Sequence, residues 1–170
     1  MKIFLIVLGV VVFSIAVVAA IGALLPKRHV IARSANFKAS PEKLYVLIAG
    51  DQSWRPDVKG CELIAGQEGR RFQRETSKHG ETILYELTDE KPPAAIVRRI
   101  AAENLPYGGS WSFELQPVEG GTRVRITEDG EVYNPIFRFV SKFVIGQTST
   151  LDTYLKAMGK AAAEDVQPEN

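Results

Sequence analysis

The stretch NPIFRFVSKFVIGQTSTLDTYLKAMGKAA, residues 134–162, decides the fold. Asn134 can cap a helix, and Pro135 suits the first helical position. Apolar residues then recur at helical spacing, with one interruption at Gly146. The residues on this apolar face are Ile136, Phe137, Val140, Phe143, Val144, Leu151, Tyr154, Leu155 and Met158. The pattern predicts one long helix over Pro135–Ala162.

The chain before this helix is a run of short strands separated by turns. The predicted strands are Cys61–Ala65, Arg70–Ser77, Glu81–Thr88, Ala94–Ala102, Gly109–Gln116 and Thr122–Thr127. Apolar and polar residues alternate, most clearly at Trp111, Phe113 and Leu115. Strands with one buried and one solvated face are typical of antiparallel sheets. Such a sheet must bury its apolar face, and the final helix is the remaining element of matching size.

One more strand, Val30–Lys38, begins the domain. Ser40-Pro41-Glu42 follows it and predicts a helix start, since Ser caps, Pro suits the first position and Glu complements the helix dipole. Gly50 ends this short helix. Asp51 can cap a second short helix that carries Trp54 and breaks near Pro56. The expected order is therefore strand, two short helices, about six strands and a long helix.

The amino-terminal residues Ile3–Leu25 contain no charge and a single hydroxyl. A helix of this length spans about 34 Å, slightly more than a hydrocarbon core of about 30 Å. Because a helix satisfies its own backbone hydrogen bonds, this segment can cross a bilayer. The alternative is a cleaved signal peptide, but the apolar run continues past Ala19-Ala20 with no polar cleavage region. We predict a single-pass transmembrane anchor over residues 1–26.

The charges around this segment favour one orientation. Only Lys2 and the amino terminus precede it, whereas Lys27, Arg28 and two further basic residues follow before the first acid. The side richer in Lys and Arg normally stays in the cytoplasm, so we expect the carboxyl-terminal domain there. The single Cys61 also suits a reducing compartment. Lys27, Arg28 and His29 can lie among lipid head groups, either as a simple flank or as a specific lipid contact.

Beyond the anchor, composition predicts one domain over residues 27–165 and a frayed polar tail over residues 166–170. Lys and Arg number 21 against 20 Asp and Glu. This balance gives no strong field for nucleic acid, so no nucleic-acid partner is expected.

The order of elements resembles the START/Bet v 1 helix-grip superfamily, also called SRPBCC, and within it the polyketide cyclase/dehydrase-like branch. The segments that carry the resemblance are Ser40-Pro41-Glu42-Lys43-Leu44-Tyr45, Asp51 to Pro56, Gly109-Ser110-Trp111-Ser112-Phe113 and Gly121-Thr122-Arg123-Val124. It covers about residues 28–163. The resemblance implies an α+β fold with a cavity between an antiparallel sheet of six to seven strands and the last helix. Members include lipid carriers, plant ligand binders and cyclases, with no shared catalytic motif to transfer.

Motifs for nucleotide binding, serine hydrolysis or zinc proteolysis are missing. Two His residues and one Cys do not easily build a metal site, so we predict no metal and no cofactor. His79 precedes Gly80 and is a surface turn residue or, as the alternative, a catalytic base. Cys61 is a buried structural thiol or, as the alternative, a nucleophile. Catalytic residues cannot be assigned from the sequence.

Polar residues on strand faces that should be apolar give the candidate site. Arg74 shares a face with Phe72, Arg98 lies between two isoleucines, and Glu128 follows Val124 and Ile126 on one face. Each is either a rim residue, part of a structural ion pair or a ligand contact. The aromatic candidates are either core packing or cavity lining. The cavity candidates are Trp54, Arg74, Tyr85, Arg98, Trp111, Phe113, Glu128 and Tyr154.

Three function hypotheses remain open. The first is a membrane-anchored domain that binds a hydrophobic small molecule or lipid. The second is a cyclase or dehydratase-type enzyme on a hydrophobic substrate, with Glu128, Tyr85 or Arg98, and less readily His79, as acid or base. The third is a protein-interaction domain without a ligand.

Overall fold

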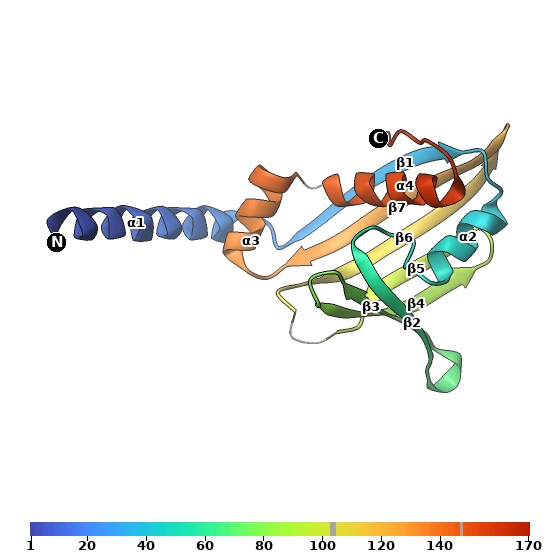
Figure 1. The fold of residues 1–170 in the computed structure, drawn as a ribbon, viewed down its shortest axis with the longest axis horizontal. Helices are drawn as coiled ribbons and strands as arrows, with labels where there is room; N and C mark the ends of the chain where they lie inside the picture. Colours follow the sequence, from blue (N-terminus) through green and yellow to red (C-terminus); the bar gives the residue numbers. More distant parts are fainter. Residues whose placement is uncertain (103–104, 147) are drawn as a thin grey trace.

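The structure is a computed structural model that describes residues 1–102, 105–146 and 148–170. Figure 1 shows a long helix, α1, that projects from a curved sheet with two helices on its inner face. The helical elements are α1 (Lys2–Leu24), α2 (Pro41–Ala49), η1 (Gln67–Gly69), α3 (Pro135–Val140), the π-helical turn η2 (Ser141–Ile145) and α4 (Ser149–Ala162). The strands are β1 (Arg28–Phe37), β2 (Val58–Ala65), β3 (Arg71–Ser77), β4 (Thr82–Lys91), β5 (Ala95–Ile100), β6 (Tyr107–Val118) and β7 (Gly121–Val132).

All seven strands form one antiparallel sheet in the order β1-β7-β6-β5-β4-β3-β2. Strands β2 to β7 follow one another as a meander, and β1 pairs with β7 at the edge. Each strand predicted from the alternation of apolar residues is present. The helix-grip architecture is therefore confirmed.

The core lies between the inner face of the sheet and helices α2 and α4. The register aligns Ala35, Val124 and Leu115 across three strands, so they share this face. Fully buried side chains from every layer meet here, and each buried Leu or Ile contributes roughly 1.5–3 kcal/mol. They include Leu44, Ile48, Ile96, Phe113, Leu115, Val124, Ile126, Leu151, Leu155 and Met158.

Helix α2 begins as the sequence predicts. The Ser40 hydroxyl accepts a hydrogen bond from the Lys43 amide, and Pro41 occupies the first turn. The prediction of a second short helix around Trp54 is wrong. Asp51 instead caps a turn by accepting bonds from the Ser53 amide and hydroxyl. The backbone there makes only turn-type bonds, because the segment is too short to continue before Pro56.

The long terminal helix is divided in two. Gly146 adopts a positive φ of 83°, which ends η2 and separates it from α4. Helix α4 lies on the sheet, whereas α3 packs against α1. The apolar residues over Pro135–Ala162 thus pack on two different surfaces. The prediction of one helix over the whole range is wrong.

Helix α1 is apolar and exposed along almost its whole length, with a mean hydropathy of 3.1 in its best window. It is the one helix in the described residues that is long and apolar enough to cross a membrane, by length and composition alone. It contacts the domain through its carboxyl-terminal part, where Val18 and Ala19 are half-buried and Gly22 is buried. Gly22 lies so close to the Pro135 carbonyl that a Cβ there would overlap it.

The carboxyl-terminal residues, expected to be frayed, are held by the domain. Glu169 exchanges both backbone hydrogen bonds with Ser34 at the free edge of β1. Val166 is buried in the core, and Arg33 donates to the Pro168 carbonyl. The polar composition of the tail gave no sign of this, because its pairing with Ser34 uses backbone atoms.

Candidate functional site

Most of the predicted cavity residues meet on the inner face of β4, β5 and β6, opposite α4. The register places Leu87, Arg98 and Trp111 side by side on that face. Tyr85 precedes Leu87 by two residues and so shares the face. Tyr154 of α4 faces these strands. The gathering of side chains from distant parts of the chain makes this face the candidate site.

Aromatic rings fill the centre of the site. The Tyr154 ring is 5.3 Å from Trp54, 5.4 Å from Trp111 and 5.4 Å from Phe113, measured between centroids. The Trp54 and Trp111 contacts are edge-to-face, which suits the opposite charge of ring edge and ring face. Trp54 also donates its indole N–H to the Leu47 carbonyl at 3.0 Å, which fixes the ring although it lies in a turn.

A buried ion cluster lies beside the rings. Glu75 of β3 accepts from Arg98 through one carboxylate oxygen and from Arg55 through the other, at 2.9 Å for Arg55. Glu75 is 5% exposed and Arg98 3% exposed, so both charges depend on each other for compensation. The Nε of Arg98 has no hydrogen-bond partner among the described residues. The guanidinium instead lies over the Tyr85 ring.

Two buried glutamines connect this cluster to α2. The Gln52 amide donates to the carbonyls of Leu47 and Ile48, and the Gln73 amide donates to Ile48 and Gly50. They satisfy the free carbonyls at the end of α2. Gln52 then accepts from the Tyr154 hydroxyl at 3.1 Å. The end of α2 is thus tied to both the sheet and α4.

Burial sets the protonation of the two tyrosines. It raises the pKa of Tyr85 to about 12, with Glu75 adding to the rise and Arg98 opposing it. Burial also raises the pKa of Tyr154 to about 12, against the opposing charges of Arg98 and Arg55. Both phenols are therefore neutral hydrogen-bonding groups at physiological pH, and neither is suited to act as a general base.

Sequence reasoning missed Glu75, Arg55, Gln52 and Gln73. On β3 it assigned Phe72 and Arg74 to the inner face, and that assignment is wrong. Arg74 is exposed and pairs with Glu62 at 2.7 Å on the outer surface. Gln73 and Glu75 point inward instead. A shift of one residue reverses the face of a whole strand, and Phe72 was the misleading signal.

Glu128 lies on the inner face directly opposite Trp111, in agreement with the predicted face. Its carboxylate is 3.0 Å from Nε2 of His29, and both side chains are half-buried. His79 is exposed in the turn between β3 and β4. Cys61 is half-buried, and burial raises the pKa of its thiol, which disfavours the reactive thiolate. The described residues contain no group of three or more His, Cys, Asp or Glu placed to hold a metal.

Burial along the inner face changes from one end to the other. Phe113 and Leu115 are sealed beneath α4, whereas Trp111, two residues nearer the α1 end, is half-buried. Tyr85 and Ile100 on the neighbouring strands are also half-buried. The aromatic and ionic cluster therefore lies where the sealed core gives way to a partly exposed surface near α3.

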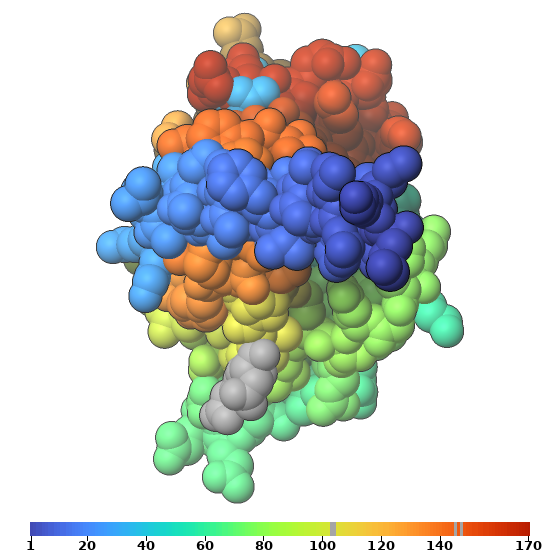
Figure 2. Space-filling model, turned by 90° about the vertical axis from the view of Figure 1, so that its left-hand side faces the viewer, coloured from blue at the N-terminus to red at the C-terminus, as the bar shows by residue number. Residues whose placement is uncertain are grey.

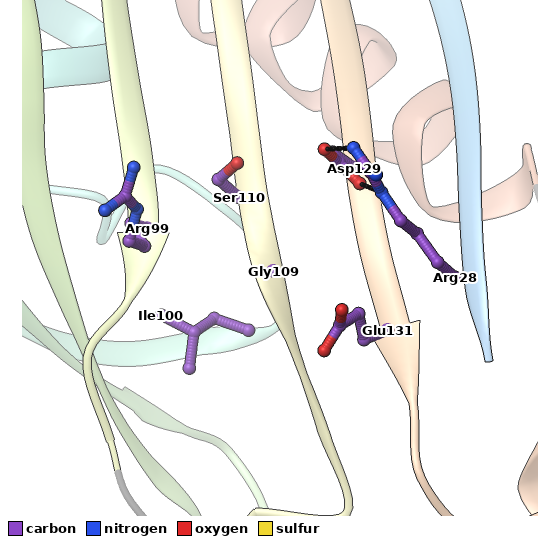
Figure 3. A pocket seen from close by; sticks show the side chains of 7 residues that line it. All are labelled: Arg28, Arg99, Ile100, Gly109, Ser110, Asp129 and Glu131. Carbon is purple, nitrogen blue, oxygen red and sulfur yellow. Dashed lines mark hydrogen bonds and ion pairs between the residues drawn. The ribbon is translucent and has the colours of Figure 1, made fainter.

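Two hollows lie near the same end, and neither is lined by α4. The first, of about 340 Å³, is on the outer face of the sheet (Figure 3). There the Arg28 guanidinium is bound by both oxygens of Asp129 at 2.6 Å, and Arg99, Ser110 and Glu131 face the same space. The second, of about 290 Å³, lies where α1 leaves the domain, beside α3 and η2.

Comparisons with known proteins agree with the fold. The sequence model of a family described as polyketide cyclase / dehydrase and lipid transport matches residues 28–164. A search of curated proteins finds no significant match. A START superfamily protein from Mycobacterium smegmatis is similar in structure, with a TM-score of 0.58, 18% identity and coverage of 79% of this chain and 97% of that chain. A protein from Mesorhizobium loti has a TM-score of 0.60 at 13% identity, with coverage of 79% and 97%.

Proposed function

Because the chain belongs to the polyketide cyclase / dehydrase and lipid transport family, we propose that its domain binds a hydrophobic small molecule or lipid between the sheet and α4. Helix α1, within an anchor of residues 1–26, holds the domain of residues 27–165 beside a membrane. The basic residues that follow α1 favour the cytoplasmic side for the domain.

One observation supports the binding site above all. An aromatic surface around Tyr154 adjoins the buried pair Arg98–Glu75 at the end of the inner face that is only half-buried. Ligand sites are mostly apolar and contain a few convergent polar groups that fix orientation. The free Nε of Arg98 and the neutral phenol of Tyr85 are such groups. A ligand with an apolar body and a small polar end fits this chemistry.

The interior is already occupied by side chains, so binding requires α4 to move or Trp111 to turn aside. The break at Gly146 allows the first option, since α3 remains on α1 while α4 shifts. The half-buried end of the inner face lies toward α1, so a ligand that enters there comes from the side of the proposed membrane.

The chain's two tryptophans, Trp54 and Trp111, both contact the Tyr154 ring and report on the site. We would reconstitute the full chain in vesicles that contain a phospholipid with brominated acyl chains, which quench tryptophan on contact. Quenching of Trp111 in the Trp54→Phe variant supports entry of an acyl chain. Unchanged fluorescence contradicts the binding of a phospholipid acyl chain between the sheet and α4.

A second reporter tests the anchor separately. In a variant with both tryptophans replaced by Phe, Phe13→Trp places the only indole in the middle of α1. Strong quenching of this reporter supports insertion of α1, independently of any ligand in the domain. If it is not quenched, the membrane location is wrong even where the domain binds lipid.

One observation favours an enzyme as a second candidate. His29 and Glu128 form a pair at the edge of the aromatic surface, next to Trp111. Such a pair can accept and return a proton, as a cyclase or dehydratase reaction on a hydrophobic substrate requires. Mass spectrometry of molecules co-purified with the chain and with Glu128→Gln provides the test. A compound that accumulates only in the variant supports an enzyme, and identical contents contradict it.

A further inference from the structure

The hollow at the foot of α1 differs in chemistry from the inner face of the sheet. It is lined by the residues that follow α1, the start of β1, Val132 of β7 and the segment α3–η2. Its lining includes five basic residues and no acidic residue. The basic residues are Lys27, Arg28, His29, Arg138 and Lys142. One of them, Arg28, turns its guanidinium to Asp129 on the outer face. Figure 2 shows this end of the molecule, with α1 in blue against α3 in orange.

Acids outside the lining neutralise only part of this charge. Arg28 is held by Asp129, and His29 by Glu128. Lys27, Lys142 and Arg138 have no ion pair with the described residues. The hollow therefore keeps a local excess of positive charge, although the whole chain is nearly neutral.

Arg138 distinguishes this hollow from an ordinary basic surface, because its guanidinium is buried. It is 8% exposed, and its Nη1 donates to the Leu25 carbonyl at 2.7 Å, just beyond the last turn of α1. Its Nε is buried and has no partner among the described residues. A buried guanidinium N–H without an acceptor is unfavourable, so the site lacks an acceptor that belongs there.

The surroundings indicate which acceptor that is. The segment α3–η2, which packs on α1, exposes large apolar side chains next to the hollow. They are Ile136, Phe137, Phe143 and Val144. The apolar surface of α1 ends at Leu24, and Leu25 and Pro26 line the hollow. With α1 across the bilayer, the hollow lies at the depth of the head groups and the apolar side chains of α3–η2 face the acyl chains.

We propose that this hollow binds the phosphate of an anionic phospholipid, with Arg138 as the buried donor and Lys27 and Lys142 as the outer cations. Guanidinium is well matched to phosphate oxygens, and such charge-assisted bonds are strong away from water. The lipid acyl chains lie along α1 and the exposed face of η2. This site is separate from the inner face of the sheet, but the proposal rests on the proposed insertion of α1.

The test uses the full chain in nanodiscs that contain phosphatidylcholine and phosphatidylglycerol in equal amounts. After transfer to detergent, native mass spectrometry counts the phospholipids that stay bound. We expect one phosphatidylglycerol per chain. Arg138→Gln and the exposed Lys142→Ala each lower its retention by about tenfold, the effect of losing one hydrogen bond to a charged group. Arg74→Ala, which removes a remote surface charge, leaves retention unchanged.

Several results would overturn the proposal. Equal retention of the two lipids excludes a specific site, and an equal loss in Arg74→Ala indicates a general charge effect. Displacement of phosphatidylglycerol by millimolar inorganic phosphate assigns the hollow to the free ion instead. Lys142→Ala is informative even if Arg138→Gln disturbs folding, because Lys142 is exposed. Quenching of the Phe13→Trp reporter by brominated lipid separates the two proposals, since it reports on α1 alone and not on this hollow.

Discussion

The guanidinium carbon of Arg98 lies 4.4 Å from the centre of the Tyr85 ring on the adjacent strand. The same guanidinium is paired with Glu75, so a cation–π contact and an ion pair share one buried charge. Neither contact was assigned from the sequence. Together they explain how the inner face of an otherwise apolar sheet accommodates an arginine, and they make the site sensitive to changes in any member.

Removing the Glu75 carboxylate leaves two guanidinium groups without their shared partner. We expect Glu75→Leu to lower the free energy of unfolding by about 3–5 kcal/mol, because Arg98 becomes an uncompensated buried charge. The double variant Glu75→Leu/Arg98→Met should recover most of this loss. Urea unfolding of the full chain in detergent measures both. Glu62→Leu, on the exposed pair with Arg74, should change stability by about 1 kcal/mol or less. A double variant no more stable than the single one would contradict the argument.

The raised pKa of Tyr154 predicts a loss of stability in alkali. Below pH about 10 the folded and unfolded chains both keep the phenol proton, and the contribution of Tyr154 to the free energy of unfolding is fully present. Between pH about 10 and 12 the unfolded chain releases the proton while the folded chain retains it. Tyr154 therefore lowers the free energy of unfolding by roughly 2–3 kcal/mol over this range, and Tyr85, whose pKa is also raised to about 12, adds to the fall.

Urea unfolding of the full chain at pH 9 and pH 12 measures this fall, and Tyr154→Phe should show a smaller one. Tyr133→Phe removes an exposed phenol, whose pKa is raised by its hydrogen bond to the Glu131 carboxylate rather than mainly by burial, and should retain most of the fall. An unchanged fall in Tyr154→Phe would mean that this phenol is not the group responsible.

The close contact between Gly22 and Pro135 predicts that α1 and α3 come apart when a side chain is added. Gly22→Val must displace the Pro135 backbone, and overpacking of this kind costs about 1–3 kcal/mol. Hydrogen exchange in residues 135–140 should then accelerate at least about fivefold. Gly9→Val, on the same helix with no atom within 4 Å of its Cβ, is the matched control. Equal exchange in both variants would show that Gly22 does not hold α3.

Much of the fold could be predicted because its signals are local. Alternation of apolar and polar residues located every strand, and Ser40-Pro41 located the start of α2. The division of the last helix was less visible, because Gly146 interrupts an apolar pattern that continues on both sides. The pattern records that both halves carry an apolar face, but it does not say against which surface each face lies.

The site was harder to predict because its polar members are stabilised by distant partners. Glu75 can be buried because Arg55 and Arg98 both pair with its carboxylate. Gln73 can be buried because its side-chain amide donates to a carbonyl at the end of α2. Neither residue is recognisable as internal from its neighbours in sequence. Phe72, in contrast, is apolar but lies on the outer face beneath Arg70, with 5.0 Å between the guanidinium and the ring centre. Buried polar residues at Gln73 and Glu75 and an outward-facing Phe72 together reversed the predicted face of β3.

The buried tail predicts that the last residues contribute to stability. Val166 is 4% exposed and packs against Gly159 of α4, where a Cβ would meet its methyl group at 2.8 Å. We expect Val166→Ala to lower the free energy of unfolding by about 2 kcal/mol, as for other losses of buried methyl groups. Gln167→Ala, at the exposed neighbouring position, should have no measurable effect. Thermal unfolding of the full chain compares the two. If both variants unfold at the same temperature as the unmodified chain, the tail is frayed in solution and its pairing with Ser34 does not contribute to stability.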